Sequence, residues 1–191
     1  MDVDLFRTIN DLQPRTAWLH SSGLFYAKTG GPLLLALLLV VGLLVARSRR
    51  SAEGVARAGW AGLSTFVAVG VNQFIVHGVD RARPYNALHH VHLLGSKSMD
   101  ASFPSDHATL AGAAIGGLFL VDRTLGIVAT VAGLLLAVGR VYVGAHYPSD
   151  VLAGLAVGAI VAVGGWFLLR RPLIAVVAWL QRSRLRPLVT A

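Results

Sequence analysis

Two segments of the sequence hold most of its unusual polar residues, and the spacing within one of them suits phosphoryl transfer. Arg140 precedes His146 by six positions, and Asp150 follows His146 by four. An aspartate so placed can accept a hydrogen bond from one ring nitrogen and leave the other free as a nucleophile or base. A guanidinium near the end of an apolar run, as at Arg140, is costly and usually marks function or an ion pair. Snorkelling of Arg140 to the interface, and a plain helix cap beside a surface histidine, are the simpler interpretations of each feature alone.

The other segment, between residues 77 and 107, supplies further candidate groups. Ser105 is a natural N-cap, and the free amides of the helical turn that follows it can bind an anion. His107 lies one step inside that helix and could donate a proton to a leaving oxygen. Arg81 and Arg83 carry forked donors that match phosphate oxygens. A capped helix start and a basic turn at the membrane surface are the plainer explanations when each feature is taken alone.

Together the arginines, the helix start and the two histidines form a candidate site for a phosphate monoester or anhydride. No metal or other cofactor is expected, because the guanidinium groups and the helix N-terminus supply the charge stabilisation. A solvated loop is the favoured interpretation of three further histidines, because the chain has no cysteine and few carboxylates lie nearby: His89, His90 and His92.

Membrane-spanning helices are the elements expected to position these residues. Of the 191 residues, 55% are hydrophobic and 14% are charged, and the mean hydropathy is +0.65. A water-soluble domain usually carries about a quarter charged residues. The absence of cysteine excludes a disulfide scaffold, a thiolate metal site and a cysteine nucleophile. An all-α integral membrane protein, with residues 1–191 as one domain, is predicted from five stretches long enough to cross roughly 30 Å of hydrocarbon: 27–46, 58–76, 106–121, 125–143 and 150–169.

The distribution of the cations orients this helical bundle. The net charge is +8, with ten lysines and arginines on one predicted side and seven on the other. The positive-inside rule makes the ten-charge side cytoplasmic, so the N-terminus and both polar segments are expected outside. Residues 1–22 predict an amphipathic interfacial helix and residues 172–191 a basic cytoplasmic tail, both anchored on membrane lipids. Because the positive charges flank the spans in this pattern, no nucleic-acid partner is expected.

Three ordered motifs resemble those of the type 2 phosphatidic acid phosphatase (PAP2) superfamily. The third signature, Ser-Arg-x5-His-x3-Asp, matches residues 139–150 at every position but the first. The second, Pro-Ser-Gly-His, matches residues 104–107 with Asp106 in place of glycine. The first, Lys-x6-Arg-Pro, retains the Arg-Pro pair at 83–84 but has Val76 at the lysine position. A PAP2-type bundle of about five transmembrane helices is what this resemblance implies.

The resemblance spans residues 60–165, which would form the PAP2 catalytic core, and is strongest to the bacitracin-resistance type of undecaprenyl-diphosphate phosphatase. It implies hydrolysis of undecaprenyl (polyprenyl) diphosphate to the monophosphate and phosphate, which recycles the lipid carrier of peptidoglycan synthesis at the bacterial plasma membrane. Other lipid phosphates also fit the motifs, namely phosphatidic acid, phosphatidylglycerol phosphate or a decaprenyl-phosphate sugar phosphate. A non-catalytic membrane protein is a further alternative, and no oligomeric state is predicted.

The family's chemistry, carried over to this sequence, implies a displacement in two steps. His146 would attack the terminal phosphorus while Asp150 holds its ring, and His107 would protonate the leaving oxygen. Water would then hydrolyse the phosphohistidine, with His107 acting as base. The phosphate oxygens would be bound by the remaining candidates, with Arg81 in place of the missing lysine: Arg83, Ser105, Arg140 and Arg81.

Overall fold

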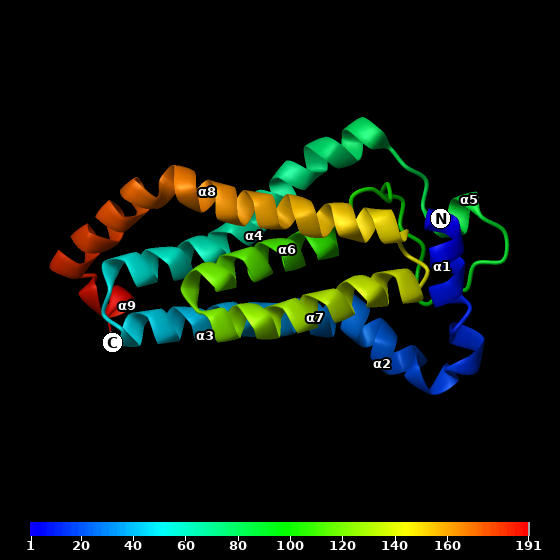
Figure 1. Ribbon diagram of the computed structural model, residues 1–191, viewed down its shortest axis with the longest axis horizontal. Coiled ribbons are helices and arrows are strands. Elements are labelled where there is room, and N and C mark those ends of the chain that lie inside the picture. Colours follow the sequence, from blue (N-terminus) through cyan, green and yellow to red (C-terminus); the bar gives the residue numbers. More distant parts are fainter. Residues whose placement is uncertain (191) are drawn as a thin grey trace.

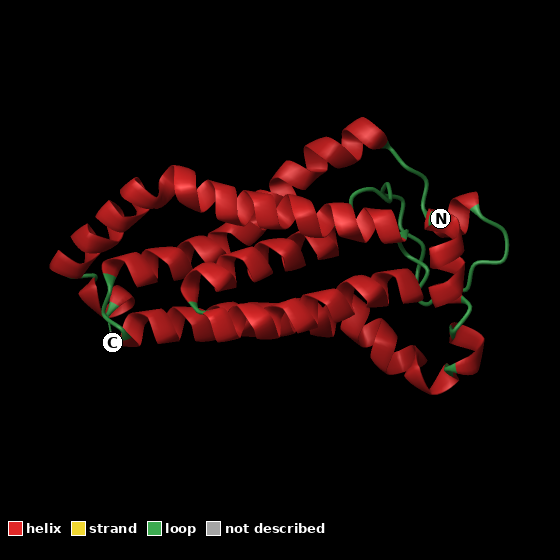
Figure 2. Cartoon of the chain, in the orientation of Figure 1, coloured by secondary structure: helices red, strands yellow, loops and turns green. Residues whose placement is uncertain are grey.

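Helices are the only regular secondary structure in residues 1–190, the part of the chain that this computed structural model describes (Figure 2). Two short 3-10 turns (Gln13–Arg15 and Ala17–Leu19) join the first two helices, and one wide π turn (Tyr26–Gly30) joins the second to the third. In chain order the helices are α1 (Asp2–Asn10), α2 (His20–Phe25), α3 (Gly31–Ser48), α4 (Ala52–Val79), α5 (Pro84–Ala87), α6 (Asp106–Val121), α7 (Arg123–Tyr142), α8 (Pro148–Arg182) and α9 (Arg186–Val189).

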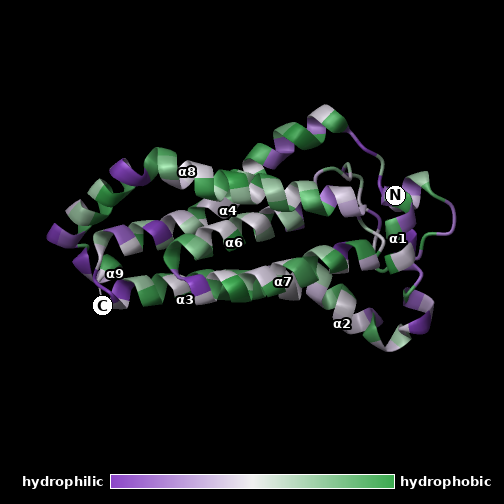
Figure 3. Cartoon of the chain, in the orientation of Figure 1, coloured by the Kyte–Doolittle hydropathy of each residue, from purple (hydrophilic) through white to green (hydrophobic). Residues whose placement is uncertain are grey.

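The long helices form an elongated bundle whose two ends differ (Figure 1). The N-terminus, α1 and α5 lie at one end, and the C-terminus, α9 and the α3–α4 turn lie at the other. Figure 3 shows hydrophobic residues along the helices between these ends. Four helical segments are long and apolar enough to cross a membrane, and the shorter α6 has 16 residues. The predicted all-α membrane fold is therefore confirmed.

The last long helix extends further than the sequence predicted. The fifth span was expected to end at residue 169 and to be followed by a tail over 172–191, whereas α8 continues through Pro172 to Arg182. Proline removes one intrahelical hydrogen bond but does not end a helix whose next turns are stabilised by packing. Here Ile174 and Val177 pack on the buried Trp60 cluster. Figure 1 shows α8 bending toward its C-terminal end.

The N-terminal segment was predicted as one interfacial helix over residues 1–22, but it is broken. Pro14 lies in a separate 3-10 turn, Gln13–Arg15, which follows the end of α1. The apolar side of α1 is also not left to lipid, because Phe6 is buried and its ring lies 5.6 Å from that of Tyr147, centroid to centroid. The side chains of Asn10 and Gln13 both donate to the carbonyl oxygen of His92 at 2.8 Å. The segment thus covers one end of the bundle.

Glycines bring α6 and α8 together at the centre of the bundle. A Cβ atom at Gly112 would lie 2.1 Å from the Leu155 carbonyl oxygen, and one at Gly158 would lie 2.0 Å from that of Thr109. Only glycine allows such close backbone approach. This contact places the start of α6 beside the start of α8, where the amide of Ser105 donates to the carbonyl oxygen of Asp150 at 3.1 Å. Two of the three motifs are therefore joined directly.

Candidate active site

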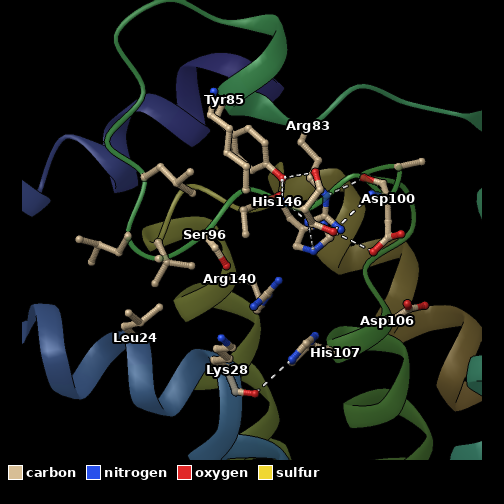
Figure 4. Close-up of a pocket in the computed structure, with 18 of the residues that line it drawn as sticks. Leu24, Lys28, Arg83, Tyr85, Ser96, Asp100, Asp106, His107, Arg140 and His146 are labelled. Atoms are coloured by element: carbon tan, nitrogen blue, oxygen red, sulfur yellow. Dashed lines mark hydrogen bonds between the residues drawn. The ribbon is translucent and has the colours of Figure 1, made fainter.

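A pocket of about 510 Å³ opens at the end of the bundle that carries the N-terminus. It is lined by the π turn before α3, the end of α4, the loop between α5 and α6, the start of α6 and the end of α7. Four of the seven predicted site residues line it together (Figure 4): Arg83, His107, Arg140 and His146.

His146 lies in the short loop between α7 and α8 and is 3% exposed. Its Nδ1 lies 2.8 Å from the carbonyl oxygen of Ser102. Because a carbonyl oxygen only accepts, Nδ1 carries the proton and Nε2 keeps the lone pair. Nη1 of Arg83 approaches Nε2 at 3.2 Å. Burial lowers the pKa of His146, with the nearby arginines adding to the shift, so the imidazole is held neutral.

Asp150 does not accept directly from His146 as the sequence suggested. The separation between His146 Nδ1 and Asp150 Oδ2 is 3.8 Å, which is too long for a hydrogen bond. The carboxylate is fully buried and accepts instead from the hydroxyl of Ser102 at 2.5 Å and the amide of Tyr147 at 2.9 Å. It therefore fixes the two backbone segments that surround the histidine ring. The i, i+4 spacing identified the right pair of residues, but Ser102 links them, with its carbonyl on the histidine and its hydroxyl on the aspartate.

The two arginines of the pocket are held by carbonyl groups. Nε of Arg83 donates to the carbonyl oxygen of Asp100 at 2.8 Å, and its Nη1 to that of Ala145 at 3.2 Å. Nη1 of Arg140 donates to the carbonyl oxygen of Ala27 at 3.3 Å. Within residues 1–190, no carboxylate lies within 4.0 Å of either guanidinium group. Their charges are fixed in place but not neutralised, which makes the pocket a site for an anion.

His107 is oriented from the segment before α3. Its Nε2 lies 3.3 Å from the carbonyl oxygen of Lys28. In a regular helix that carbonyl would accept from the residue four positions later, which is Pro32 and has no N–H group. The amide of Gly31 is also diverted, because it bonds the carbonyl of Tyr26 across the π turn. The carbonyl groups of residues 27 and 28 are thus left free for Arg140 and His107.

Arg81, the expected substitute for the missing lysine, lies outside the pocket. Its Nη2 donates to Asp2 at 2.7 Å, and its Nη1 donates to Asp150 at 2.6 Å. The guanidinium carbon also lies 3.9 Å from the centroid of the Tyr147 ring. Two carboxylates and an aromatic face already satisfy this side chain. The expectation that Arg81 binds phosphate therefore does not agree with its position, because its charge is used to hold α1 to α8.

Ser105 also stands apart from the pocket lining. It is the N-cap of α6, but within residues 1–190 its side chain makes no capping hydrogen bond, and its buried Oγ has no partner there. The first intrahelical bond of α6 is donated by Thr109 to the carbonyl of Ser105 at 2.9 Å. The amides of residues 106–108 have no intrahelical acceptor and are the groups at this helix start that could contact an anion.

A family comparison agrees with this geometry. The family model described as PAP2 superfamily matches residues 57–173. The chain belongs to the PAP2 superfamily. With its membrane-length helices it is a multi-pass membrane lipid phosphatase of PAP2 type.

Known PAP2-type proteins are similar over most of this chain. It is 34% identical over 164 residues to undecaprenyl-diphosphatase BcrC of Bacillus subtilis (strain 168), covering 84% of this chain and 80% of that protein. It is 36% identical over 141 residues to decaprenylphosphoryl-5-phosphoribose phosphatase of Mycobacterium tuberculosis (strain CDC 1551 / Oshkosh), covering 71% and 72%. The crystal structure of Aquifex aeolicus LpxE superposes with a TM-score of 0.64 at 25% identity, covering 87% of this chain and 94% of that one.

Two departures from the PAP2 motifs lie next to each other in the structure. Val76, at the lysine position, lines the pocket on α4. Asp106, at the glycine position, faces the same helix, where its Oδ1 accepts from Asn72 at 2.7 Å and from Gln73 at 2.9 Å. The wall formed by α4 and the start of α6 therefore lacks the usual cation and carries a carboxylate instead.

Sequence reasoning missed several groups of the pocket. Lys28 and Lys97 line it, and the hydroxyl of Tyr85 donates to the carbonyl of Ser98 at 3.1 Å and so holds the loop over the pocket. The sequence signal that could have identified Lys28 is its position: it is a lone lysine at the start of an apolar span, four residues before a proline. The loop histidines His89, His90 and His92 are exposed and do not line the pocket.

Proposed function

We propose that this PAP2 protein removes the terminal phosphate of a polyprenyl diphosphate, such as undecaprenyl diphosphate, and so regenerates the lipid monophosphate carrier of cell-wall synthesis. The observation that carries the proposal is the pair of guanidinium groups, Arg83 and Arg140, which meet two histidines and form no ion pair with a carboxylate of the described residues. Such a pocket binds a multiply charged phosphate group. The relative from Bacillus subtilis, named for undecaprenyl diphosphate, supports this choice of lipid.

The proposed reaction has two steps that use the lone pair of His146 Nε2. This nitrogen attacks the terminal phosphorus, and the bond from phosphorus to the bridging oxygen breaks as the P–N bond forms. Arg83 and Arg140 stabilise the charge on the transferred phosphoryl oxygens. His107 donates a proton to the bridging oxygen, and then accepts one from the water that hydrolyses the P–N bond. Asp150 acts as a positioning residue.

An apolar groove offers room for the lipid tail of the substrate. It has a volume of about 440 Å³ and lies between α3, α4 and the start of α6. Pro32, Val69 and Leu110 line the groove. Each lies one helical turn from a residue that lines the charged pocket, namely Lys28, Gln73 and His107 respectively. A lipid whose phosphate is bound by the arginines could therefore place its hydrocarbon chain in this groove, within the membrane.

The test is phosphate release by purified protein in detergent, with undecaprenyl diphosphate, phosphatidic acid and phosphatidylglycerol phosphate compared at equal surface concentration. We expect the highest kcat/KM for the diphosphate. His146→Ala should be inactive and should not form the acid-labile phosphoprotein that a rapid acid-free quench traps from substrate labelled in its terminal phosphate. A preference for a glycerolipid would keep the mechanism and reject the proposed substrate, and an active His146→Ala variant would reject the nucleophile.

We also propose that the pocket faces the outside of the cell and the C-terminus the cytoplasm. The basic turn between α3 and α4 and the arginines after α8 lie at the end away from the pocket, as the positive-inside rule requires of a cytoplasmic end. Because the chain has no cysteine, single cysteines report sidedness directly. In intact spheroplasts, an impermeant maleimide should label Met99→Cys, at the pocket end, and not Leu185→Cys until the membrane is permeabilised.

A further inference from the structure

The pocket contains positive charge beyond its two arginines. Lys28, from the π turn before α3, and Lys97, from the loop between α5 and α6, also line it. The two acidic residues of the lining do not neutralise them. Asp106 accepts from amide side chains of α4, and Asp100 accepts from the hydroxyl of Ser98 at 2.8 Å. In the described part of the chain, no carboxylate lies within 4.0 Å of either lysine.

Lys28 lies on the side of the pocket that carries His107. Figure 4 shows Arg83 beside His146 in one part of the pocket, and Lys28 beside His107 in another, with Arg140 between the two groups. The hydrogen bond from His107 to the Lys28 carbonyl fixes this neighbourhood. An ammonium group at the start of a membrane span is costly unless it meets an anion or the interface.

Lys97 is less available for a ligand. Its ammonium lies 5.8 Å from the centroid of the Tyr85 ring, within the range of a cation–π interaction. It belongs to the loop over the pocket, and both lysines are exposed residues. Lys28 is the one that lies beside His107, whereas Lys97 lies against the Tyr85 ring.

The in-line geometry of phosphoryl transfer determines which group of the substrate would lie near Lys28. The attacking and leaving atoms lie on opposite sides of the transferred phosphorus. Attack by His146 therefore places the leaving oxygen toward the proton donor, His107. In a diphosphate this oxygen belongs to a second phosphate, whereas in a monophosphate it belongs to an uncharged alcohol. We propose that Lys28 binds the second, lipid-bearing phosphate, so that the site has a leaving-phosphate subsite and selects diphosphates. This inference rests on the proposed function and specifies its substrate class.

The electron balance explains why a cation is useful at this position. When the bridging P–O bond breaks, its electron pair stays on the leaving phosphate, which gains negative charge as the P–N bond forms. His107 supplies one proton to that oxygen, and the Lys28 ammonium stabilises the remaining charge. Lys28 would also compensate for Val76, since from the π turn it adds a cation to a pocket whose α4 wall lacks the usual lysine.

The test compares two substrates that share one tail, farnesyl diphosphate and farnesyl monophosphate, with Lys28→Met, Lys28→Arg and the matched control Lys97→Met. Lys28→Met should lower kcat/KM for the diphosphate about 10- to 100-fold and for the monophosphate less than about 3-fold, the loss expected for one charged contact. Lys28→Arg should keep the selectivity. Since His107 is held by the backbone of Lys28, these substitutions leave its orientation intact.

Inhibition by inorganic anions provides a second readout that does not require turnover of the monophosphate. Lys28→Met should raise the inhibition constant of pyrophosphate about tenfold or more and leave that of phosphate within about threefold. Equal losses on both farnesyl substrates, or a selective loss in Lys97→Met rather than Lys28→Met, would overturn the proposal. Failure of the proposed function gives a different result, because the unmodified protein would then release no phosphate from either prenyl substrate.

Discussion

Ser102 connects Asp150 to His146: its hydroxyl donates to the carboxylate at 2.5 Å, and its carbonyl oxygen lies 2.8 Å from Nδ1 of the histidine. The histidine ring is thus held by a backbone group that the aspartate holds in turn. The aspartate is fully buried and does not line the pocket, although its Oδ2 lies 3.8 Å from Nδ1 of His146. We therefore propose that it positions the ring and does not contact the substrate.

The variant Asp150→Asn tests whether the aspartate positions the histidine ring or contacts the substrate. An amide cannot accept all the donors that surround this carboxylate, so the Ser102 segment and the ring it holds should shift. We expect kcat to fall about 10- to 100-fold with KM within about threefold, because one buried partner is lost and no substrate contact is removed. The matched control is Asp80→Asn, since Asp80 is exposed and does not line the pocket. A rise in KM as large as the fall in kcat would contradict a positioning role.

Replacing Arg81 should mainly lower stability, whereas replacing Arg140 should mainly lower catalytic activity. Arg140→Met should lower kcat/KM about 100-fold or more without lowering the melting temperature, because its unneutralised charge serves the substrate. Arg81→Met should lower the melting temperature, since it leaves Asp2 and the buried Asp150 without their cation, a loss of about 3 kcal/mol in the free energy of unfolding. Thermal unfolding in detergent and steady-state kinetics measure both. An Arg81→Met protein of unchanged stability but much higher KM would mean that Arg81 contacts phosphate.

Pro32 should matter for catalysis although it touches no reacting group. Pro32→Ala restores an N–H group that can bond the Lys28 carbonyl and compete with His107 for it. We expect kcat/KM to fall about 3- to 10-fold while the melting temperature stays equal or rises. Pro172→Ala, which changes the other helix-interior proline far from the pocket, should leave kcat/KM unchanged. If both variants behave alike, the freed carbonyl has no catalytic role.

The histidine proposed as the nucleophile, His146, should remain neutral in mild acid. Burial lowers the pKa of His146 below its ordinary value of about 6.5, and the neutral form is the one present above the pKa. The acid limb of kcat/KM that belongs to this group should therefore lie below pH 6.5. The ¹⁵N chemical shifts of histidine-labelled protein measure the titration directly, with His146→Asn identifying the resonance. A midpoint at or above 6.5 would show that the ring is more solvated than its position implies.

Motif spacing predicted side chains that come together at one pocket, but it did not predict the contacts that backbone groups make. Arg83, His107, Arg140 and His146 do line one pocket. The bond between His146 and Ser102 uses a carbonyl group, which every residue has, so no residue type could have indicated it. Hydropathy likewise gave the helices, because apolar length is what a bilayer requires. It could not give the end of α8 or the position of Lys28, since both depend on packing and on prolines within apolar runs.

Arg81 shows a further limit of reasoning from residue types. An arginine next to a phosphate motif can bind the anion or the carboxylates that support the site, and its chemistry is the same in both cases. The deciding partner, Asp2, lies 79 positions away in the sequence. Only the fold brings α1 across the bundle end to meet it.

The glycine contact between α6 and α8 has an evolutionary consequence. Because no β-carbon fits at Gly112 or Gly158, this junction tolerates almost no substitution, and it fixes the relative placement of the helix starts that carry two motifs. In the loop between α5 and α6 and in the π turn before α3, which also line the pocket, a glycine Cβ would meet a side chain and not backbone: Leu24 at 3.3 Å for Gly95 and Phe25 at 2.8 Å for Gly30. Divergence toward new lipid headgroups is therefore expected to accumulate in those two segments, while the junction is inherited unchanged.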